Sequence, residues 1–469
     1  MNLNQTLQEK YPHLEVSVFS YSKVKEHLIF GSEFNSNTRE NAIQSIVSNK
    51  NVNDYFELIN TNVSTLKEFI YIYDLTHSLG NFMIDVEPTQ EIGSNKKEAI
   101  KGDFVISRLR SYLKEMAVIQ SKNFKQLLST EYLVYRPKTN LLSSNTLLAF
   151  SLSRIVQTIL NYSQYGTEHP RFYEFVFNEM PIPKCLLLMN AEIDSIMNKA
   201  YEVLEQSKIF YKKAEETLYL ELGLDPKNPL QSLLDSKTNN PTKSLNISIH
   251  TLKESFLKTG RLDSEYYQKK YEINEKIIMN KKYTVLDNLV SITKSIEPGS
   301  NLYKNKGIPF IRVANLTQYG LSEGDVFLDE KDFFPQYLQI LYPKKDTILF
   351  SKDGSVGIAY CVKEDKEVIT SGAILHLNIK DKENILPEYL TLFLNSIFVK
   401  LQAQRDCGGS IISHWRIEDI KKVLVAILDI KIQEKIAKYI QESFNLRKKS
   451  KQLLDNAKNK VEEQIQGKI

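Results

Sequence analysis

Two stretches of helical spacing, 243 residues apart, constrain the fold of this chain more than any other feature. Each repeats apolar or small residues at alternating intervals of three and four, and every member of the second stands 243 positions after a member of the first. The first series is Leu186, Met189, Ile193, Ile196, Ala200, Val203, Ser207, Phe210, Ala214 and Thr217. The second is Ile432, Ile436, Tyr439, Ser443, Leu446, Ser450, Leu453 and Ala457. Such spacing makes the stripe of a coiled coil, in which each helix needs a partner.

Two such helices in one chain can supply each other. The material folded between them would bring them together, and we expect an antiparallel pair that holds two domains. Serines and alanines in both stripes make the pairing weaker than an all-leucine zipper would be. The alternative is two ordinary surface helices, each packed on a separate domain.

The repetition extends upstream of the helices and indicates a duplicated unit. Gly166-Thr167 matches Gly409-Ser410 at the same offset of 243. Further upstream, GDFVISRLRSYLKEMAVI resembles KDTILFSKDGSVGIAYCV, with Ser107 facing Ser351 after a single-residue shift. At the front, VSVFSYSKV resembles ISIHTLKES at an offset of 231 to 232. Insertions of about a dozen residues therefore separate the copies, as expected for loops that diverged after a duplication.

Each copy is predicted to be an α+β unit. Segments such as TILFS, GIAYCV and AILHLNI are short, β-branched or aromatic, and bounded by Gly, Asp or Lys, which predicts strands. PEYLTLFLNSIFVKLQAQ and NTLLAFSLSRIVQTIL predict helices. The segment LGLDPKNPLQSLLDSKTNNPTKSLN is rich in Pro, Asn and Ser and is the predicted linker, with the boundary near residues 226–244.

Composition bounds the class of protein. A chain of 469 residues with 42% hydrophobic residues predicts two or more domains with real cores. Cys185, Cys361 and Cys407 lie far apart without a CxxC pair, which favours a reducing cytoplasm over a disulfide framework or a zinc site. No apolar signal region or membrane-spanning stretch occurs, so we expect a cytoplasmic protein without a membrane partner. The net charge of +4 is compatible with nucleic acid but too mild to identify it.

Four segments of the second unit resemble the DNA-specificity subunits of Type I restriction-modification systems. They are GIPFIRVANLTQYGL, DTILFSKDGSVGIAYCV, VITSGAILHLNI and CGGSIISHWRIEDIKKVLVAILDIKIQEKIAKYIQ. The first unit is similar more loosely, through IYIYDLTHSLGNFMI, KGDFVISRLRSYLKEMAVI and QYGTEHPRFYEFVFNEMPIP. The order of globular unit, heptad helix, globular unit, heptad helix also resembles that family.

The resemblance implies an α+β fold with two tandem target recognition domains, each followed by a long helix, and the two helices pairing as an antiparallel coiled coil. Each domain would read one half of a bipartite DNA site, while the helices would set the spacer and dock other subunits. The implied ranges are 1–185 for domain 1, 186–222 for helix 1, 223–245 for the linker, 246–429 for domain 2 and 430–469 for helix 2.

The implied partners are double-stranded DNA, two DNA methyltransferase subunits and ATP-dependent restriction or translocase subunits. S-adenosylmethionine, ATP and Mg²⁺ would be bound by those partners, and this chain would carry no cofactor. Two other classes stay open: a recognition subunit of another methyltransferase-based defence system, and a coiled-coil interaction scaffold. The scaffold would show no salt-sensitive binding to duplex DNA.

The sequence carries no recognised signature of catalysis. A DNA methyltransferase needs a glycine loop for the methyl donor and an (N/D)PP(Y/F) tetrapeptide, and the nearest approach, NNPT at 239–242, lacks the second proline. No G-x-x-x-x-G-K-(S/T) loop occurs that would cradle ATP. The region of Asp346 offers no Glu-x-Lys pair of the nuclease type. We therefore expect a non-catalytic recognition protein.

Base recognition needs polar side chains on loops that reach a DNA groove, and phosphate contacts need positive charge. Two clusters in each unit, at equivalent places in the repeat, meet this need. In the first unit the candidates are Arg108, Arg110, Tyr112, Lys114, Gln164, Tyr165, Thr167, His169 and Arg171. In the second they are Ser351, Lys352, Ser355, Arg405, Ser410, Ser413 and His414, with Arg312 and Asn315 in addition. For each residue alone, a turn or a surface salt bridge is the commoner role.

Trp415, the only tryptophan, matches Phe172 across the repeat. An indole could stack on DNA, but this match to a phenylalanine favours a place in the core.

Overall fold

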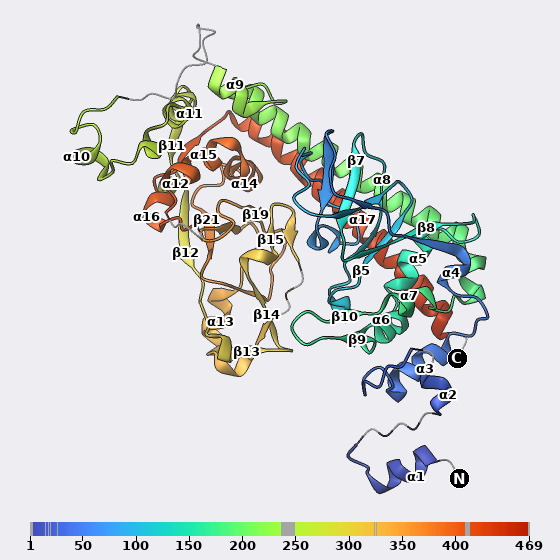
Figure 1. The fold of residues 1–469 in the computed structure, drawn as a ribbon. Helices are drawn as coiled ribbons and strands as arrows, with labels where there is room; N and C mark the ends of the chain where they lie inside the picture. Colours follow the sequence, from blue (N-terminus) through green and yellow to red (C-terminus); the bar gives the residue numbers. More distant parts are fainter. Residues whose placement is uncertain are drawn as a thin grey trace. The chain divides into compact units, whose positions relative to one another are not determined.

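The computed structural model describes residues 3–14, 16, 18, 20–25, 27–235, 249–322, 324, 326–408 and 413–467. It divides the chain into two compact units, whose elements are labelled in Figure 1. Unit 1 consists of Met1–Leu204 with Arg447–Ile469, and unit 2 of Glu205–Leu446. The boundaries fall inside two long helices, α8 (Lys184–Glu221) and α17 (Ile430–Gln466). Each unit therefore combines a globular part with one segment of each long helix.

The core of unit 1 surrounds a four-stranded antiparallel sheet with the order β1-β8-β5-β6. Its strands are β1 (Phe56–Ile59), β8 (Tyr132–Pro137), β5 (Phe104–Ser107) and β6 (Met116–Val118). The helices that follow are α5 (Ser144–Ser151), α6 (Arg154–Asn161) and α7 (Glu174–Asn178). Phe104, Tyr135 and Phe177 are fully buried between them, with ring centroids 5.1 to 6.4 Å apart. Aromatic side chains of this size supply much of the apolar burial.

A second sheet of unit 1 has the order β2-β4-β7-β3, and β3 runs parallel to β7. Its strands are β2 (Asn62–Val63), β4 (Lys96–Ala99), β7 (Lys125–Ser129) and β3 (Ile70–Tyr73). A short hairpin joins β9 (Gln164–Tyr165) to β10 (Arg171–Phe172). The first helices of the chain are α1 (Leu3–Lys10), α2 (Tyr21–Val24), α3 (Asn37–Ser45) and α4 (Val52–Tyr55).

Unit 2 repeats the central sheet of unit 1 in the order β12-β21-β18-β19, again antiparallel throughout. Its strands are β12 (Val290–Lys294), β21 (Ile374–Ile379), β18 (Ile348–Ser351) and β19 (Ala359–Cys361). The helices that follow are α14 (Pro387–Asn395), α15 (Ile397–Asp406) and α16 (Ile417–Ile420). Trp415 is buried beside Phe350, and Phe172 is buried in unit 1. The core position predicted for Trp415 is therefore confirmed.

The second sheet of unit 2 differs from its counterpart in pairing. Its order is β13-β17-β14-β20, and β14 runs parallel to β20. In unit 2 the antiparallel strand β17 pairs with β14, the earlier strand of the parallel pair. In unit 1 the antiparallel strand β4 pairs with β7, the later strand of the parallel pair. Its strands are β13 (Tyr303–Lys304), β17 (Phe327–Leu328), β14 (Ile308–Ile311) and β20 (Ile369–Thr370). The remaining elements are α9 (Pro229–Asp235), α10 (Phe256–Thr259), α11 (Lys269–Met279), β11 (Tyr283–Val285), α12 (Leu286–Leu289), β15 (Leu316–Thr317), β16 (Gly320–Leu321), α13 (Pro335–Leu341) and β22 (Leu424–Ala426). Both units are thus α+β, as the sequence predicts.

Segments of α8 and α17 pair antiparallel within each unit. In unit 1 the Ser450 hydroxyl donates to the carbonyl of Ala200 (2.7 Å), and Lys460 pairs with Glu192 (2.7 Å). In unit 2 the Ser443 hydroxyl donates to the carbonyl of Ser207 (2.7 Å). Partners rise along one helix as they fall along the other, which is the antiparallel direction predicted. Supercoiling of the pair stays a prediction.

The buried stripe of this pair differs from the predicted one at most of the positions between its seven-residue anchors. On α8 the buried residues include Ile193, Met197, Ala200, Ser207, Tyr211, Ala214 and Leu218. On α17 they include Ile436, Ile440, Ser443, Ser450, Leu454, Ala457, Val461 and Ile465. The anchors seven residues apart were predicted correctly. Between them Val203 is buried as predicted, while most of the other buried residues lie one position later than expected. Adjacent apolar residues, such as Ile196 and Met197, left this choice to the partner helix.

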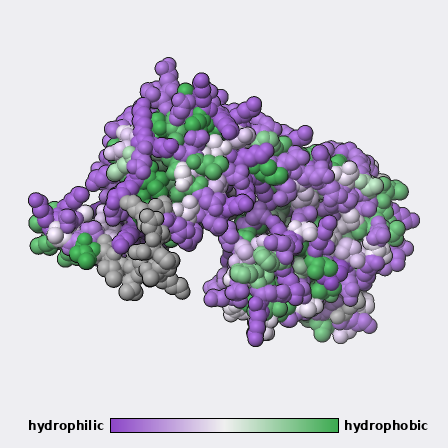
Figure 2. Space-filling view, turned by 90° about the horizontal axis from the view of Figure 1, so that it is seen from above, coloured by the Kyte–Doolittle hydropathy of each residue, from purple (hydrophilic) through white to green (hydrophobic). Residues whose placement is uncertain are grey.

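No helix in the described part of the chain is both long enough and apolar enough to cross a bilayer. The face drawn in Figure 2 is mostly hydrophilic, with apolar side chains gathered in separate patches. Scattered apolar residues are normal on the surface of a folded protein.

Candidate nucleic-acid interface

In unit 1, the segment that follows β5 is fixed by backbone hydrogen bonds from two sides. Arg108 N–H donates to the carbonyl of Glu131 (3.1 Å), in the turn before β8. The carbonyl of Arg108 accepts from Phe172 N–H (3.0 Å), in β10. Residues 108–115, here called loop 1, therefore begin from a rigid point and contain four of the predicted DNA-contacting residues.

In unit 2, the segment that follows β18 is fixed in the same way. Lys352 N–H donates to the carbonyl of Ala373 (2.8 Å), before β21, and the carbonyl of Lys352 accepts from Trp415 N–H (2.8 Å). Residues 352–358, here called loop 2, hence occupy the place of loop 1. The sequence repeat therefore corresponds to a repeated pair of backbone hydrogen bonds, at Arg108 in unit 1 and at Lys352 in unit 2.

Loop 1 meets the second predicted cluster of unit 1, residues 164–171. Arg110 N–H donates to the carbonyl of Pro170 (2.8 Å), and Arg110 Nη2 lies 3.1 Å from His169 Nδ1. Gln164 Nε2 donates to the hydroxyl of Ser111 (2.8 Å). The two clusters, about 50 residues apart in sequence, therefore form one surface.

The backbone of loop 1 is strained at two predicted residues. Arg110 and Lys114 have φ values of 50° and 54°, in the left-handed region that L-residues visit at some cost. They bracket a short 3₁₀ turn over Ser111–Leu113, which leaves the ring of Tyr112 exposed. Backbone strain of this kind persists only where surrounding contacts impose it.

Arg108 and Arg171 bind the same carboxylate. Arg108 Nε donates to Glu131 Oε2 (3.0 Å), while Arg171 donates from Nε and Nη2 to both oxygens. The hydrogen bond from Arg171, followed by that from Arg108, lowers the pKa of Glu131 against the opposing effect of its burial. The carboxylate is therefore ionised at neutral pH and holds two guanidinium groups together.

The other candidates of unit 1 lie on the same surface with fewer contacts. The ring of Tyr165 stacks on Tyr173, with centroids 4.2 Å apart. Thr167 and Lys114 are exposed, and the Lys114 carbonyl accepts from the side chain of Asn81 (2.9 Å).

Loop 2 places its charges differently. Lys352 Nζ pairs with the neighbouring Asp353, and its side chain is only 16% exposed. Asp353 Oδ1 also lies 2.9 Å from His414 Nδ1, and the His414 side chain is 60% exposed. Gly354 N–H donates to the carbonyl of Ser413 (2.9 Å). Loop 2 thus joins its second cluster, as loop 1 does, but its lysine is neutralised by an adjacent acid.

The serines of loop 2 divide between structure and surface. Ser351 is fully buried; its hydroxyl donates to the carbonyl of Ser355 (2.6 Å) and accepts from Ile358 N–H (2.9 Å), which closes the loop. Ser355 and Ser413 are exposed. Ser410 lies outside the described residues.

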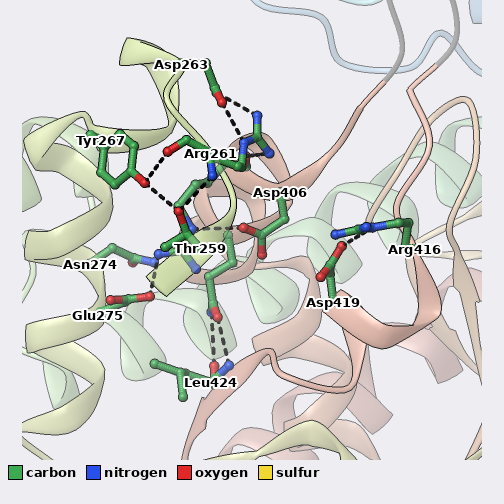
Figure 3. Close-up of polar contacts among 12 residues, drawn as sticks. Thr259, Arg261, Asp263, Tyr267, Asn274, Glu275, Asp406, Arg416, Asp419 and Leu424 are labelled. Carbon is green, nitrogen blue, oxygen red and sulfur yellow. Dashed lines mark hydrogen bonds and ion pairs between the residues drawn. The ribbon is translucent and has the colours of Figure 1, made fainter. Parts of the chain in front are cut away.

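The Arg405 side chain is held by ion pairs with two acidic residues. It binds Asp406 and Glu275, and its guanidinium carbon lies 5.3 Å from the centre of the Tyr266 ring. Figure 3 shows the surrounding polar contacts, which include the pairs Arg261–Asp263 and Arg416–Asp419. These partners tie α15 to α11 and give Arg405 a structural role in this conformation.

Arg312 and Asn315 lie in the segment between β14 and β15 of unit 2. Arg312 precedes a 3₁₀ turn over Val313–Asn315, where Asn315 Oδ1 accepts from Arg312 N–H (3.0 Å) and Asn315 is buried.

Sequence reasoning missed the two carboxylates that organise these loops, Glu131 and Asp353. Glu131 stands 23 residues after Arg108, in a turn, and no spacing rule joins it to either arginine. Asp353 follows Lys352 directly in SKDGSVG and could have been found from that adjacency. Among the described residues no group of three or more His, Cys, Asp or Glu could hold a metal ion.

Comparison with protein-family models gives one match, to the Type I restriction modification DNA specificity domain, over residues 280–458. This range contains the central sheet of unit 2, loop 2 and most of α17. Residues 280–458 therefore match a Type I restriction-modification DNA specificity domain, which confirms the resemblance seen in the second unit. No curated protein sequence matches the chain.

Three solved structures of this class resemble the chain over most of its length. The HsdS subunit from Thermoanaerobacter tengcongensis is 14% identical, with 90% of this chain and 96% of that chain covered and a TM-score of 0.29. The S subunit from M. genitalium is 12% identical, with coverages of 89% and 95% and a TM-score of 0.38. A chain from a study of complex assembly and conformational transition of the type I R-M system is 14% identical, with coverages of 89% and 96% and a TM-score of 0.28. These TM-scores lie below 0.5, so the likenesses add nothing to the family match.

Proposed function

We propose that this chain is the specificity subunit of a Type I restriction-modification complex and that each unit reads one half of a bipartite duplex DNA target. The proposal rests on the backbone hydrogen bonds that fix loops 1 and 2 in the same way, together with the family match over residues 280–458. Two loops held in the same way, each with polar and basic side chains at its surface, suit two recognition events of the same kind.

The proposal assigns no reaction to this chain. Two DNA methyltransferase subunits would bring S-adenosylmethionine, and ATP-dependent restriction or translocase subunits would bring ATP and Mg²⁺. The purified chain should neither methylate nor cleave DNA nor hydrolyse ATP. Turnover that copurifies with the chain through successive columns would contradict this assignment.

Mapping methylated bases genome-wide tests the two-unit reading. Cells carrying the native chain, with its partner subunits, should show a methylated motif split by a spacer. A hybrid in which loop 1 and residues 164–171 come from a chain of different specificity should alter one half of that motif only. The matched hybrid of loop 2 with residues 408–414 should alter the other half. A contiguous motif, or a hybrid that changes both halves together, would contradict the proposal.

A further inference from the structure

Glu131 connects two arginines from different parts of unit 1. Arg171 grips its carboxylate from Nε (3.0 Å) and Nη2 (2.7 Å), and donates a further bond from Nη1 to the carbonyl of His169 (3.1 Å). Arg108 donates to the carboxylate from Nε alone (3.0 Å). Two cations share one anion, so a net positive charge remains, and the geometry leaves it on Arg108.

The terminal nitrogens of Arg108 are available for a ligand. Among the described residues neither Nη1 nor Nη2 of Arg108 makes a hydrogen bond, and its side chain is 34% exposed. A guanidinium group is planar and carries its donors in a fixed fork. With Nε held by Glu131, this fork is fixed in direction and points its second edge away from the carboxylate.

The main chain of Arg108 is held as firmly as its side chain. Its N–H donates to the carbonyl of Glu131, in the turn before β8, and its carbonyl accepts from Phe172 N–H, in β10. Little conformational freedom is left to lose when a ligand binds, and such preorganisation favours affinity and specificity.

Unit 2 lacks this arrangement at the equivalent place. Ala373 receives the backbone bond there and has no carboxylate, and Lys352 replaces the arginine. The Lys352 ammonium is instead covered by Asp353. An arginine fixed by a carboxylate is therefore a feature of loop 1 and not of the backbone arrangement that the two loops share.

We propose that Arg108 reads a guanine in the half-site of unit 1, donating from Nη1 and Nη2 to guanine O6 and N7, and that Glu131 is its positioning residue. The inference rests on the proposed function and names one specificity-determining contact within it. Bidentate donation to O6 and N7 is the commonest specific contact of arginine in the major groove. A phosphate contact fits less well, because the Glu131 carboxylate reduces the local positive charge and repels phosphate.

Binding of the full-length chain to its mapped target duplex tests the inference. Each guanine in the half-site of unit 1 is replaced in turn by 7-deazaguanine, which loses the N7 acceptor and keeps Watson–Crick pairing. We expect one replacement to weaken binding of the native chain about tenfold. Arg108→Lys lacks the planar fork, so it should bind the unmodified target more weakly than the native chain and should respond less to that replacement.

Two further variants separate positioning from charge. Glu131→Gln should lose most of the discrimination at the same guanine, while its binding to a scrambled duplex stays equal or becomes stronger because a negative charge is removed. Arg136→Lys is the matched control: Arg136 grips Asp103 with two bonds at the far end of β8, and its side chain is also 34% exposed. This control should keep the native pattern.

The outcomes distinguish the inference from the function on which it rests. If the native chain prefers its target to the scrambled duplex but no guanine responds, or if Arg108→Lys weakens both duplexes equally, Arg108 contacts phosphate and the inference is wrong. If the native chain shows no preference, the proposed function itself fails. Thermal unfolding of each variant is measured alongside, and if Glu131→Gln does not fold, Arg108→Lys with the 7-deazaguanine series decides alone.

Discussion

Loops 1 and 2 share their backbone contacts and differ in the charges that these contacts support. In unit 1, Glu131 lies across the loop and holds two arginines; in unit 2, Asp353 lies within the loop and covers a lysine. The hydrogen bonds that fix both loops join main-chain atoms and so do not depend on side-chain identity. A scaffold of this kind can present different side chains at the same place, which suits two reading surfaces for two unrelated half-sites.

The largest expected difference between the units comes from their helix segments. Ile193 of α8 lies in the buried core of unit 1, and Ile436 of α17, 243 residues later, lies in the buried core of unit 2. Ile193→Asp or Ile436→Asp would bury an unpaired carboxylate and should cost about 3–5 kcal/mol. Because the only tryptophan is in unit 2, thermal unfolding followed by Trp415 fluorescence should move more for Ile436→Asp.

The control for these variants is Leu188→Asp, since Leu188 is exposed on the same helix α8. It should leave unfolding unchanged, while circular dichroism should record the loss in unit 1 for Ile193→Asp. Equal fluorescence and circular dichroism transitions for all three variants and the native chain would mean that the helix segments contribute nothing to the cores.

An acid-sensitive position distinguishes the central sheets. His376 of β21 is buried with its Nε2 2.8 Å from the hydroxyl of Thr370, and burial lowers the pKa of His376 to about 4. At the equivalent register of β8 stands Val134. In the unfolded chain His376 takes up a proton near pH 6.5, whereas in the folded chain it stays neutral down to about pH 4. The stability that neutral His376 contributes is therefore fully present above pH 6.5 and is lost as the pH falls toward 4.

Unit 2 should therefore lose about 1.4 kcal/mol per pH unit across that window. Trp415 fluorescence during urea unfolding at pH 7, 6 and 5 measures it. His376→Val, which copies unit 1, should flatten the pH dependence. A slope that survives this substitution would assign the acid sensitivity to other groups.

The smallest expected effect concerns loop 2. Asp353→Asn should release Lys352 and His414 from their shared carboxylate, and the plot of log affinity against log salt should steepen by about one unit. Asp346→Asn is the matched control, because Asp346 pairs with Lys382 away from loop 2 and asparagine tolerates its left-handed φ of 68°. An unchanged slope for Asp353→Asn would mean that loop 2 does not approach DNA phosphates.

Much of the fold could be predicted because the sequence contains two copies of the same arrangement. The 243-residue offset located both helices, and the buried anchors Ile193 and Ile436 follow directly from it. Most residues between anchors, with Val203 the exception, were misplaced by one, since neighbouring apolar side chains fit the spacing equally well and the facing helix decides between them. Periodicity therefore predicted the elements better than the exact faces they bury.

The candidate surface could be predicted in outline but not in its electrostatics. Loop 1 and residues 164–171 were both singled out, and the structure brings them together through Arg110 and His169. Glu131 was missed because its link to Arg108 depends on strand pairing that places a turn beside a loop 23 residues away. Ser351 and Arg405 were singled out by residue type, and burial and ion pairs give both of them structural contacts.

Both boundaries between the units fall inside the long helices, and this affects the order in which the parts of unit 1 are synthesised. The core of unit 1 includes Leu454, Ala457, Val461 and Ile465, which are synthesised some 250 residues after the first segment of that unit ends at Leu204. At about 5–20 residues per second, the ribosome takes about 10–50 s to supply them. During that interval the apolar stripe of α8 in unit 1 is without its native cover. A message truncated before codon 447 would leave the unit that was translated first without part of its core.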